Sequence, residues 1–287
     1  MNYSALIQNR KSVRAFSERY VSFEDMDKIK VYHAIRAKRL LPEVNTELRV
    51  FGLDAKAALE GAAGYEKFLV GAPQYLVLLS QQHPYAIENG GYIMEDLLLK
   101  LADMGLDSCW LSFHDSEYIK SALEIESDMD VVAIAAFGYG EKAVRRLRLN
   151  KVSMSNVDIS AQRQYFNPKL SVEELVSLNR WGNREGVEER IGFYDDLLWE
   201  ALYAASLAPS YLNRQPYGFV LHESGISLVQ KPDEYTGEAS GKLNLGIVLL
   251  HFSAVAEEWA GKVVWNLGEA PELQLPEGFK AIASCAL

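Results

Sequence analysis

The sequence predicts an α+β fold built from two diverged halves of one structural unit. Amphipathic helix patterns open with a phenylalanine at Phe23 and again at Phe193. Long apolar helix patterns contain Gly91 and Gly246, and each is followed at the same distance by a tryptophan. Helix, polar loop, strand, central helix, tryptophan and strand therefore occur twice in the same order, which is the signature of an internal repeat.

In the first half, each element is predicted from its own pattern. Residues 74–80 (QYLVLLS) are apolar without alternation, which is typical of a strand buried on both faces. Residues 90–105 are strongly apolar and predict a central helix. Residues 131–137 (VVAIAAF) predict another buried strand, which ends at Gly138-Tyr139-Gly140. Helices are also predicted over 3–9 and 23–40, and a strand over 48–53.

The second half repeats this order after a polar connection. Residues 150–190 are expected to be irregular, with loops at Asn167-Pro168 and Trp181-Gly182-Asn183. Residues 213–221 (NRQPYGFVL) match residues 45–53 (NTELRVFGL). A last strand over 279–286 is expected to pair with residues 131–137. The predicted units are therefore 1–152, a connection over 153–190, and 191–287.

Composition restricts the class of protein. The 287-residue chain is 49% apolar and carries a net charge of −10, which disfavours a nucleic-acid surface. No segment approaches the roughly 18 apolar residues of a membrane span, and Met1 to Ser4 show no secretory signal. Cys109 and Cys285 share no motif. These features predict a cytoplasmic protein with reduced thiols, in which Cys109 is a packed core residue.

The first stretch that indicates chemistry is RKSVRAF, residues 10–16. In an extended chain, Arg10, Ser12 and Arg14 point to the same side. Two guanidinium groups and a hydroxyl then converge, which suits a phosphate group. Basic triplets at helix ends are also common and are then merely solvated.

The second stretch is APSYLNRQPY, residues 208–217, named here the APS loop. Pro209 and Pro216 restrict φ at both ends, so ordering the loop costs less entropy. Ser210, Asn213 and Gln215 offer donors and acceptors for a polar heterocycle or a polyol. The alternative is a turn that ends a helix, with Ser and Asn bonding backbone groups. That alternative leaves Gln215-Pro216 unexplained.

The two stretches together resemble the flavin-dependent nitroreductase family. Its members carry R-[RK]-S-x-R-x-F near the start and A-P-S-x-x-N-x-Q-P-[WY] in a loop, and this chain has both in full. GLDSCWL, GYGEKAVRRLRLNKV and GAPQYLVLL are also similar to family segments. The resemblance covers the first 152 residues and about 191–267, and it implies a nitroreductase-like α+β fold with FMN as cofactor.

The chain departs from the family in one respect. Ordinary members place both motifs in one copy, and two identical chains form the FMN site at their interface. Here the basic motif lies in the first half and the APS loop in the second. The first half has Glu43 at the serine position, and the second half has WGNREGVEERIGF (181–193) at the basic position. The resemblance thus implies a fused dimer, a monomer in solution, with one FMN per chain.

The resemblance also implies roles for individual residues. Arg10 and Ser12, with Lys11, would hold the FMN phosphate, joined by Arg146 or Arg148. Arg14 would lie near the N1/C2 edge of the flavin, where a cation favours the reduced state. Trp110, Leu111 and Ser112 would line the flavin edge near N5, and Gly64 and Tyr65 the ribityl chain or pyrimidine edge. Pro209, Ser210, Asn213 and Gln215 would close the site from the second half.

The implied activity is that of an FMN-dependent oxidoreductase with a ping-pong mechanism. Hydride would pass from NAD(P)H to the flavin and then to a nitroaromatic, a quinone or a similar flat acceptor. Three alternatives remain open: an FMN carrier without turnover, a dehalogenase or flavin-remodelling member of the family, and a purely structural fold. No metal motif is present in the sequence, GEASGK (237–242) is one residue short of a phosphate loop, and His83-Pro84-Tyr85 either lines the substrate opening or forms a surface turn.

Overall fold

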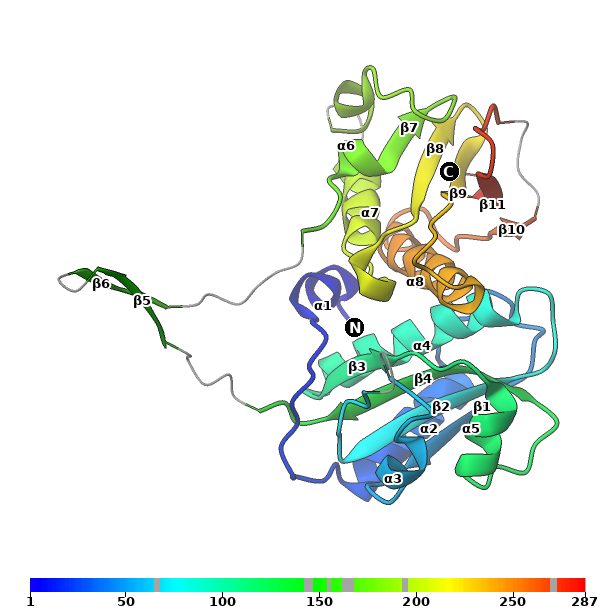
Figure 1. The fold of residues 1–287 in the computed structure, drawn as a ribbon. Coiled ribbons are helices and arrows are strands. Elements are labelled where there is room, and N and C mark those ends of the chain that lie inside the picture. Colours follow the sequence, from blue (N-terminus) through cyan, green and yellow to red (C-terminus); the bar gives the residue numbers. More distant parts are fainter. Residues whose placement is uncertain are drawn as a thin grey trace.

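The computed structural model describes residues 1–64, 68–141, 147–153, 156–161, 168–192, 196–268 and 273–286. Two lobes lie one above the other, and one long helix from each lobe fills the space between them (Figure 1). The chain is mixed helix and largely antiparallel sheet, which confirms the predicted α+β class.

The first lobe contains a four-stranded sheet in the order β1-β2-β4-β3. All three strand pairs are antiparallel. The strands are β1 (Thr46–Phe51), β2 (Gln74–Ser80), β3 (Asp107–Leu111) and β4 (Asp130–Gly138).

The second lobe contains a five-stranded sheet in the order β10-β11-β9-β8-β7. The strands are β7 (Val176–Leu178), β8 (Tyr217–His222), β9 (Gly225–Gln230), β10 (Asn266–Leu267) and β11 (Lys280–Cys285). Pairs among β8, β9, β11 and β10 are antiparallel, whereas β7 joins β8 in parallel. Apart from β7, the strand order repeats that of the first sheet.

Two sequence-based expectations about these segments are wrong. The last strand, β11, pairs with β9 and β10 and does not pair with residues 131–137. It occupies in the second sheet the place that β4 occupies in the first, because each lobe completes its own sheet. Residues 150–190 are not irregular throughout: β5 (Leu147–Ser153) pairs with β6 (Asn156–Ala161), and this hairpin stands apart from both sheets (Figure 1).

The helices agree in order with the predictions, although their ends differ. They are α1 (Tyr3–Asn9), α2 (Phe23–Ile35), α3 (Ala55–Leu59), α4 (Ala86–Asp103), α5 (Ser116–Ala122), α6 (Val172–Leu175), α7 (Asp196–Ser206) and α8 (Glu238–Ala256). A π-helical turn covers Glu188–Gly192, and a 3-10 turn covers Tyr211–Asn213. The helix predicted over 23–40 ends at Ile35, and the central helix begins at Ala86, ahead of the predicted residue 90.

The first sheet has helices on both faces, which explains the continuous apolar run in β2. Leu76 and Leu78 join the core that includes residues of α2 and α4. Val77 and Leu79 point the other way and join the core that includes residues of α3 and α5. A strand covered on both sides has no solvent face, so its sequence does not alternate.

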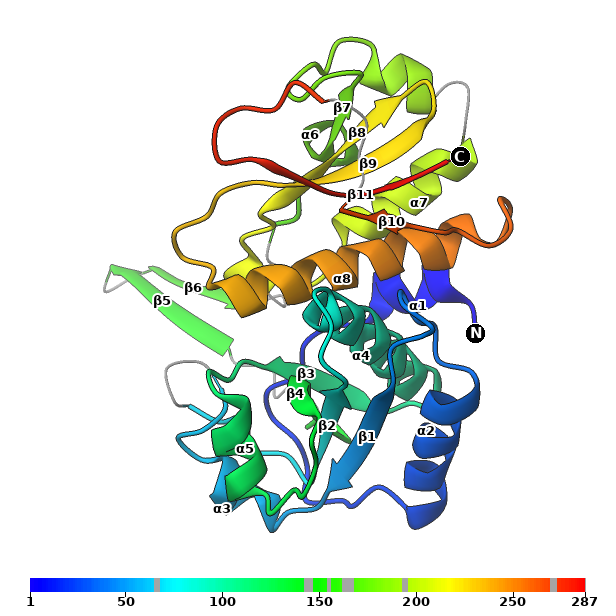
Figure 2. The ribbon, with the colours of Figure 1, turned by 90° about the vertical axis from the view of Figure 1, so that its right-hand side faces the viewer.

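The two lobes meet where α4 crosses α8 (Figure 2). A Cβ atom at Gly91 would lie 2.5 Å from the carbonyl oxygen of Leu243 on α8. A Cβ atom at Gly246 would lie 1.9 Å from the carbonyl oxygen of Glu88 on α4. Each glycine meets the residue three positions before the other glycine, so the contact is reciprocal. Only glycine lets the two backbones come this close.

The same reciprocity holds for two asparagines near the crossing. Asn89 on α4 accepts backbone hydrogen bonds from Leu40 and Leu41 through Oδ1, at 3.1 and 3.0 Å. Asn244 on α8 accepts one from the backbone nitrogen of Tyr211 at 3.0 Å. Each central helix therefore holds the polar loop of its own lobe with an equivalent side chain.

Helix α8 is the single described helix that is long and apolar enough to cross a membrane by length and composition. Its residues from Asn244 to Ala256 are buried inside the protein, against α4 and α7. Its apolar composition is that of a core helix.

The helix crossing leads to a first prediction. Gly246→Ala forces the new methyl group against a backbone carbonyl, and overpacking of this kind typically costs ~1–3 kcal/mol. The free energy of unfolding measured in urea should fall accordingly. Gly237→Ala at the start of the same helix is the control, because a Cβ there meets nothing within 4 Å. Equal stability of the two variants would contradict the close backbone contact.

Candidate functional site

The N-terminal basic motif, residues 10–16, runs as an extended segment beside β3. Ser12 forms a parallel bridge with Ser108, and the backbone nitrogen of Val13 donates to the Ser108 carbonyl at 2.9 Å. Phe16 forms a second bridge with Gly140, and its ring is buried in the core below. The phenylalanine of the motif thus anchors the segment, while the edge of the first sheet sets its direction.

Arg10 is held by a carboxylate from the central helix. Its Nε lies 3.2 Å from Glu95 Oε1, with side-chain exposures of 8% for the arginine and 0% for the glutamate. Its Nη1 is buried and has no hydrogen-bond partner. The salt bridge therefore uses one side of the guanidinium and leaves a donor on the other side unused. Such a donor costs free energy unless a ligand supplies an acceptor.

Glu95 also binds two side chains besides Arg10. Trp110, at the end of β3, donates from Nε1 to Glu95 Oε2 at 2.7 Å. His251, on α8 of the other lobe, lies with Nε2 3.0 Å from Glu95 Oε1, and its Nδ1 faces the carbonyl oxygen of Ala204 at 3.0 Å. Burial alone would raise the pKa of Glu95, but Arg10, His251 and Trp110 hold it below its ordinary value.

Lys169 brings a second cation to this region. Its Nζ donates to the carbonyl oxygen of Ala208, the first residue of the APS loop, at 2.7 Å. Burial and the nearby Arg10 lower the pKa of Lys169 to about 8, against the opposing effect of Glu95. Lys169 was not predicted as a site residue, because it lies in the connection expected to be irregular and belongs to no motif.

The polar side chains of the APS loop are engaged with nearby backbone. Ser210 Oγ accepts from the backbone nitrogen of Gln215 at 3.1 Å. Asn213 donates to the carbonyl of Pro168 at 2.7 Å, and Gln215 Oε1 accepts from the nitrogen of Leu170 at 3.2 Å. Leu212, Asn213 and Gln215 have φ values of 50°, 56° and 48°. These hydrogen bonds hold a backbone conformation that is uncommon for residues other than glycine.

Gly64 and Ser112, both predicted to lie near the flavin, are direct neighbours. The Gly64 nitrogen donates to the Ser112 carbonyl at 2.7 Å, and Ser112 Oγ donates to the Gly64 carbonyl at 2.9 Å. Gly64 has a φ of +105°, and a Cβ there would lie 2.1 Å from the backbone oxygen of Phe68. Glycine is therefore required at this position by the local backbone.

Arg14 is exposed, as is Lys11, whereas Ser12 is half-buried. The positive charges of Arg10 and Arg14 both favour the ionised thiol of Cys109 in β3. Burial outweighs them and raises the pKa of Cys109. The thiol is 3% exposed, which confirms the predicted packed core residue.

The structure therefore brings one group of the predicted residues together. Arg10 and Trp110 both contact Glu95, and Lys169, which binds the start of the APS loop, feels the charges of Arg10 and Glu95. Gly64 and Ser112 lie beyond the last residue of β3. Leu111 is buried, and Pro209 is half-buried. Tyr65 and Arg146 lie outside the described residues, as does the side chain of Arg148. Glu95 and His251 were missed because single polar residues in apolar helices carry no sequence motif.

A cavity of about 330 Å³ lies between the two lobes next to Ser112. Both central helices contribute to it, through Ala86 and Ile87 of α4 and Ser240 and Leu243 of α8. His83 also lines this cavity. The remaining lining residues are Gln82, Phe113, His114, Ser116, Asp130, Val131, Val132 and Ala239.

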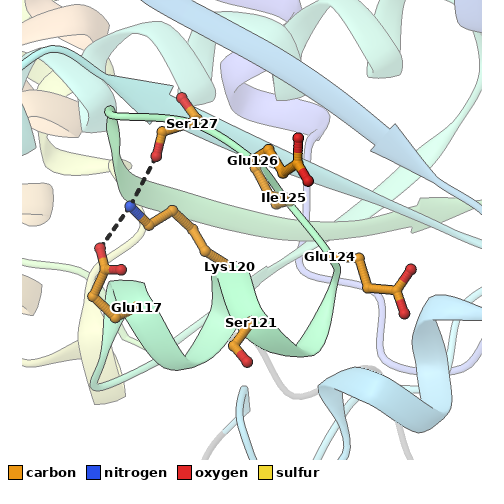
Figure 3. A pocket seen from close by; sticks show the side chains of 7 residues that line it. All are labelled: Glu117, Lys120, Ser121, Glu124, Ile125, Glu126 and Ser127. Carbon is orange, nitrogen blue, oxygen red and sulfur yellow. Dashed lines mark hydrogen bonds and ion pairs between the residues drawn. The ribbon is translucent and has the colours of Figure 1, made fainter.

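A second hollow of about 370 Å³ lies near the end of α5 and shares no lining residue with the cavity (Figure 3). Lys120 crosses it, with Nζ 2.6 Å from Glu117 Oε1 and 3.2 Å from the carbonyl of Ser127. The cation thus already has protein acceptors. Among the described residues, no group of three or more His, Cys, Asp or Glu side chains could hold a metal ion.

Comparison with known proteins identifies the fold. Residues 2–177 match the family model described as "Putative TM nitroreductase". The whole chain is similar to 94% of a Thermotoga maritima structure described as a "putative nitroreductase", with 19% identity and a TM-score of 0.60. A comparison with curated proteins gave no match.

Shorter solved structures match about half of the chain. An FMN-dependent nitroreductase of Clostridium difficile has 22% identity and a TM-score of 0.41, and the match covers 53% of this chain and 98% of that one. A protein of Bacteroides thetaiotaomicron described as "Putative NADH dehydrogenase/NAD(P)H nitroreductase" has 19% identity and a TM-score of 0.42, with coverages of 54% and 94%.

The α+β fold is thus of the nitroreductase class. Because the family model matches more than half of the sequence, the chain belongs to the nitroreductase family that this model describes.

Glu95 provides a second prediction. Glu95→Gln leaves Arg10 buried without its counter-charge, and breaking a buried pair in this way typically costs ~3–5 kcal/mol. Asp96→Asn is the control, because the neighbouring buried Asp96 accepts its hydrogen bonds, within the described part of the chain, from Tyr3, Tyr32 and a backbone nitrogen. Asp96→Asn should lower the free energy of unfolding less than Glu95→Gln does, since the donors to Asp96 are neutral.

The pH dependence follows from the lowered pKa of Glu95. A carboxylate whose pKa is depressed in the folded state stabilises the fold above the ordinary value of 4.5, and this contribution disappears as the pH falls through the folded pKa. Acid unfolding of the wild type should include this loss, and Glu95→Gln should lack it. Parallel acid-unfolding curves for the two proteins would contradict an ionised Glu95.

Proposed function

We propose that the protein is an FMN-dependent oxidoreductase that transfers hydride from NAD(P)H to a flat organic acceptor. The observation that carries this proposal is the set of cations around Arg10. One carboxylate, Glu95, fixes Arg10, while the buried Nη1 has no partner and the ammonium of Lys169 acts on Arg10 from the other lobe. A phosphate group matches this surplus of positive charge.

The residues of the N-terminal basic motif suit FMN. Arg10 offers its free Nη1 and Ser12 a half-buried hydroxyl to the phosphate, and Lys11 is available from the exposed side. Gly64 and Ser112 would face the flavin at the far end of β3, and Trp110 lies between these two regions. Pro209, Ser210, Asn213 and Gln215 would close the site from the second lobe. Arg146 or Arg148 remains a proposed additional phosphate ligand.

Bound FMN would supply the chemistry of accepting and passing on hydride. The protein would position the reactants and provide electrostatic stabilisation. Arg14 would place a positive charge at the N1/C2 edge, where negative charge collects on reduction. The hydrogen bond from Trp110 to Glu95 would fix the orientation of the indole ring, whichever molecule is bound beside the flavin. The double hydrogen bond between Gly64 and Ser112 would keep Gly64 beside the end of β3.

We further propose that the chain is a fused dimer, which acts as a monomer with a single FMN site. The repeated strand order and the reciprocal contacts of Gly91 and Gly246 support two copies related by a twofold axis. The second site lacks its basic segment beside β10. The corresponding chain upstream of α7 instead forms β7, which pairs with β8 at the opposite side of the sheet.

The place equivalent to the APS loop in the first lobe supports the same view. Asp96 accepts hydrogen bonds from Tyr3, Tyr32 and the backbone of Lys38, and Lys38 forms an ion pair with Glu257 of the second lobe. In these contacts the charges of Asp96 and Lys38 are both satisfied by protein groups.

The cavity beside Ser112 supports a flat acceptor of modest size. Its walls combine apolar side chains, such as Ile87 and Leu243, with the imidazoles of His83 and His114. Half of the lining residues are polar, so the cavity offers hydrogen bonds as well as apolar contacts to a small molecule. Because both lobes line the cavity, the acceptor would bind only where the two halves are correctly joined. The same opening would admit NAD(P)H, since the described fold shows no separate dinucleotide-binding sheet.

The decisive experiment is an anaerobic titration of the FMN-loaded protein with NADH and then NADPH. Loss of the oxidised flavin absorbance is expected. Arg14→Ala should slow this reduction on the order of tenfold or more, as loss of a preorganised charge does in other enzymes. FMN affinity should change much less. Arg19→Ala is the control, because Arg19 lies over the ring of Tyr139 at 3.8 Å.

The competing function is that of an FMN carrier. In that case the flavin stays oxidised with both donors, and Arg14→Ala changes only the dissociation constant for FMN. A protein that binds no FMN at all, with Arg10→Ala indistinguishable from wild type, would refute both functions.

The cavity yields a separate prediction. Ser240→Trp should fill the space beside α8, raise KM for a quinone or nitroaromatic acceptor several-fold and leave FMN affinity unchanged. Ser121→Trp is the matched control, because Ser121 lines the other hollow, near the end of α5, and does not line this cavity (Figure 3). Unchanged steady-state kinetics for Ser240→Trp would place the acceptor elsewhere.

A further inference from the structure

The APS loop forms hydrogen bonds with three successive residues, Pro168, Lys169 and Leu170, and these bonds fix the position of Lys169. Asn213 donates to the carbonyl of Pro168, just before the lysine, and Gln215 accepts from the nitrogen of Leu170, just after it. Between them, Lys169 itself donates to Ala208 at 2.7 Å. Two polar side chains of the loop therefore hold the backbone on both sides of one lysine. This arrangement gives Asn213 and Gln215 a task in positioning Lys169.

The position that results is electrostatically unfavourable without an anion. Lys169 is half-buried, and Arg10 lies close enough for the two positive charges to repel each other. Among the described residues, Glu95 forms the salt bridge with Arg10 and also acts on Lys169, and it is already engaged by Arg10, His251 and Trp110. A carbonyl oxygen satisfies a hydrogen bond of the ammonium but not its charge. Two fixed cations with one shared counter-charge are the arrangement expected of a site that binds an anion.

We propose that Lys169 is a ligand of the FMN phosphate, placed opposite Arg10 by the APS loop. This inference rests on the proposed function and adds to it a residue outside the two motifs. It also gives the basic motif and the APS loop a joint role although they lie in different halves. The motif supplies one cation, and the loop holds the other in place.

A pH dependence follows for FMN binding. The pKa of Lys169 without ligand is about 8, mainly because of burial and Arg10. Above this pH the lysine loses its proton, and binding the phosphate dianion then requires proton uptake. FMN affinity should therefore fall as the pH rises from 7 to 9. Among the described residues, Arg10 and Glu95 are the charged groups that act on the Lys169 ammonium.

The test compares FMN with riboflavin, which lacks the phosphate. In the wild type, FMN should bind more tightly, and Lys169→Met should reduce the ratio of the two affinities on the order of tenfold or more, as expected for one charge-assisted hydrogen bond. Riboflavin affinity should stay the same. Lys169→Arg should restore the ratio and remove the decline between pH 7 and 9. Lys231→Met is the control, because the pKa of Lys231 is also lowered by burial but its charged neighbours are Arg184, Glu174 and Asp233.

Three outcomes separate the possible failures. If the wild type binds neither flavin, the proposed function fails. If FMN binds but Lys169→Met leaves the FMN-to-riboflavin ratio unchanged, the proposed function stands and this inference is overturned. If the ratio is unchanged while a preference for NADPH over NADH disappears in Lys169→Met, the lysine binds the phosphate of the donor and the assignment to FMN is overturned.

Discussion

The buried carboxylate of Glu95 is the interaction on which the remaining site depends. It lies on α4 between the lobes, with no solvent exposure, and binds Arg10, Trp110 and His251. These three come from the basic motif, the end of β3 and the other central helix. A charge without water must be neutralised locally, so its partners have little freedom. The carboxylate thereby joins the packing of the two lobes to the orientation of one arginine.

The crossing of α4 and α8 makes this contact possible. Gly91 and Gly246 let the helix backbones touch, and this brings His251 within reach of Glu95. The crossing is reciprocal, but the residues next to it are not. On one side Arg10 pairs with Glu95 and keeps a buried Nη1 without a partner, whereas on the other Asp96 is satisfied by tyrosine hydroxyls and a backbone nitrogen. A symmetric scaffold with asymmetric charges accounts for one proposed FMN site instead of two.

Local patterns were sufficient for most elements of the fold. The apolar run 74–80 and the helix containing Gly91 were predicted because burial determines their composition. The pairing of β11 was not, because an apolar strand carries no information about which sheet it completes. The hairpin of β5 and β6 was missed since polar residues form it away from any core. The helix ends differ from the predictions by a few residues, because where a helix ends depends on its neighbours as much as on its own sequence.

By itself, the sequence determined the α+β class, the repeated order of elements, and the motifs that contain Arg10, Ser12 and the APS loop. These properties are encoded by residues close together in the chain. The tertiary structure alone decided that Glu95 orients Arg10, that His251 joins it from the second lobe, and that Asn213 and Gln215 hold the backbone around Lys169. These contacts link residues far apart in sequence, and the distances between them depend on how two helices cross. A single charged residue in an apolar helix pattern shows its partner only once the chain has folded.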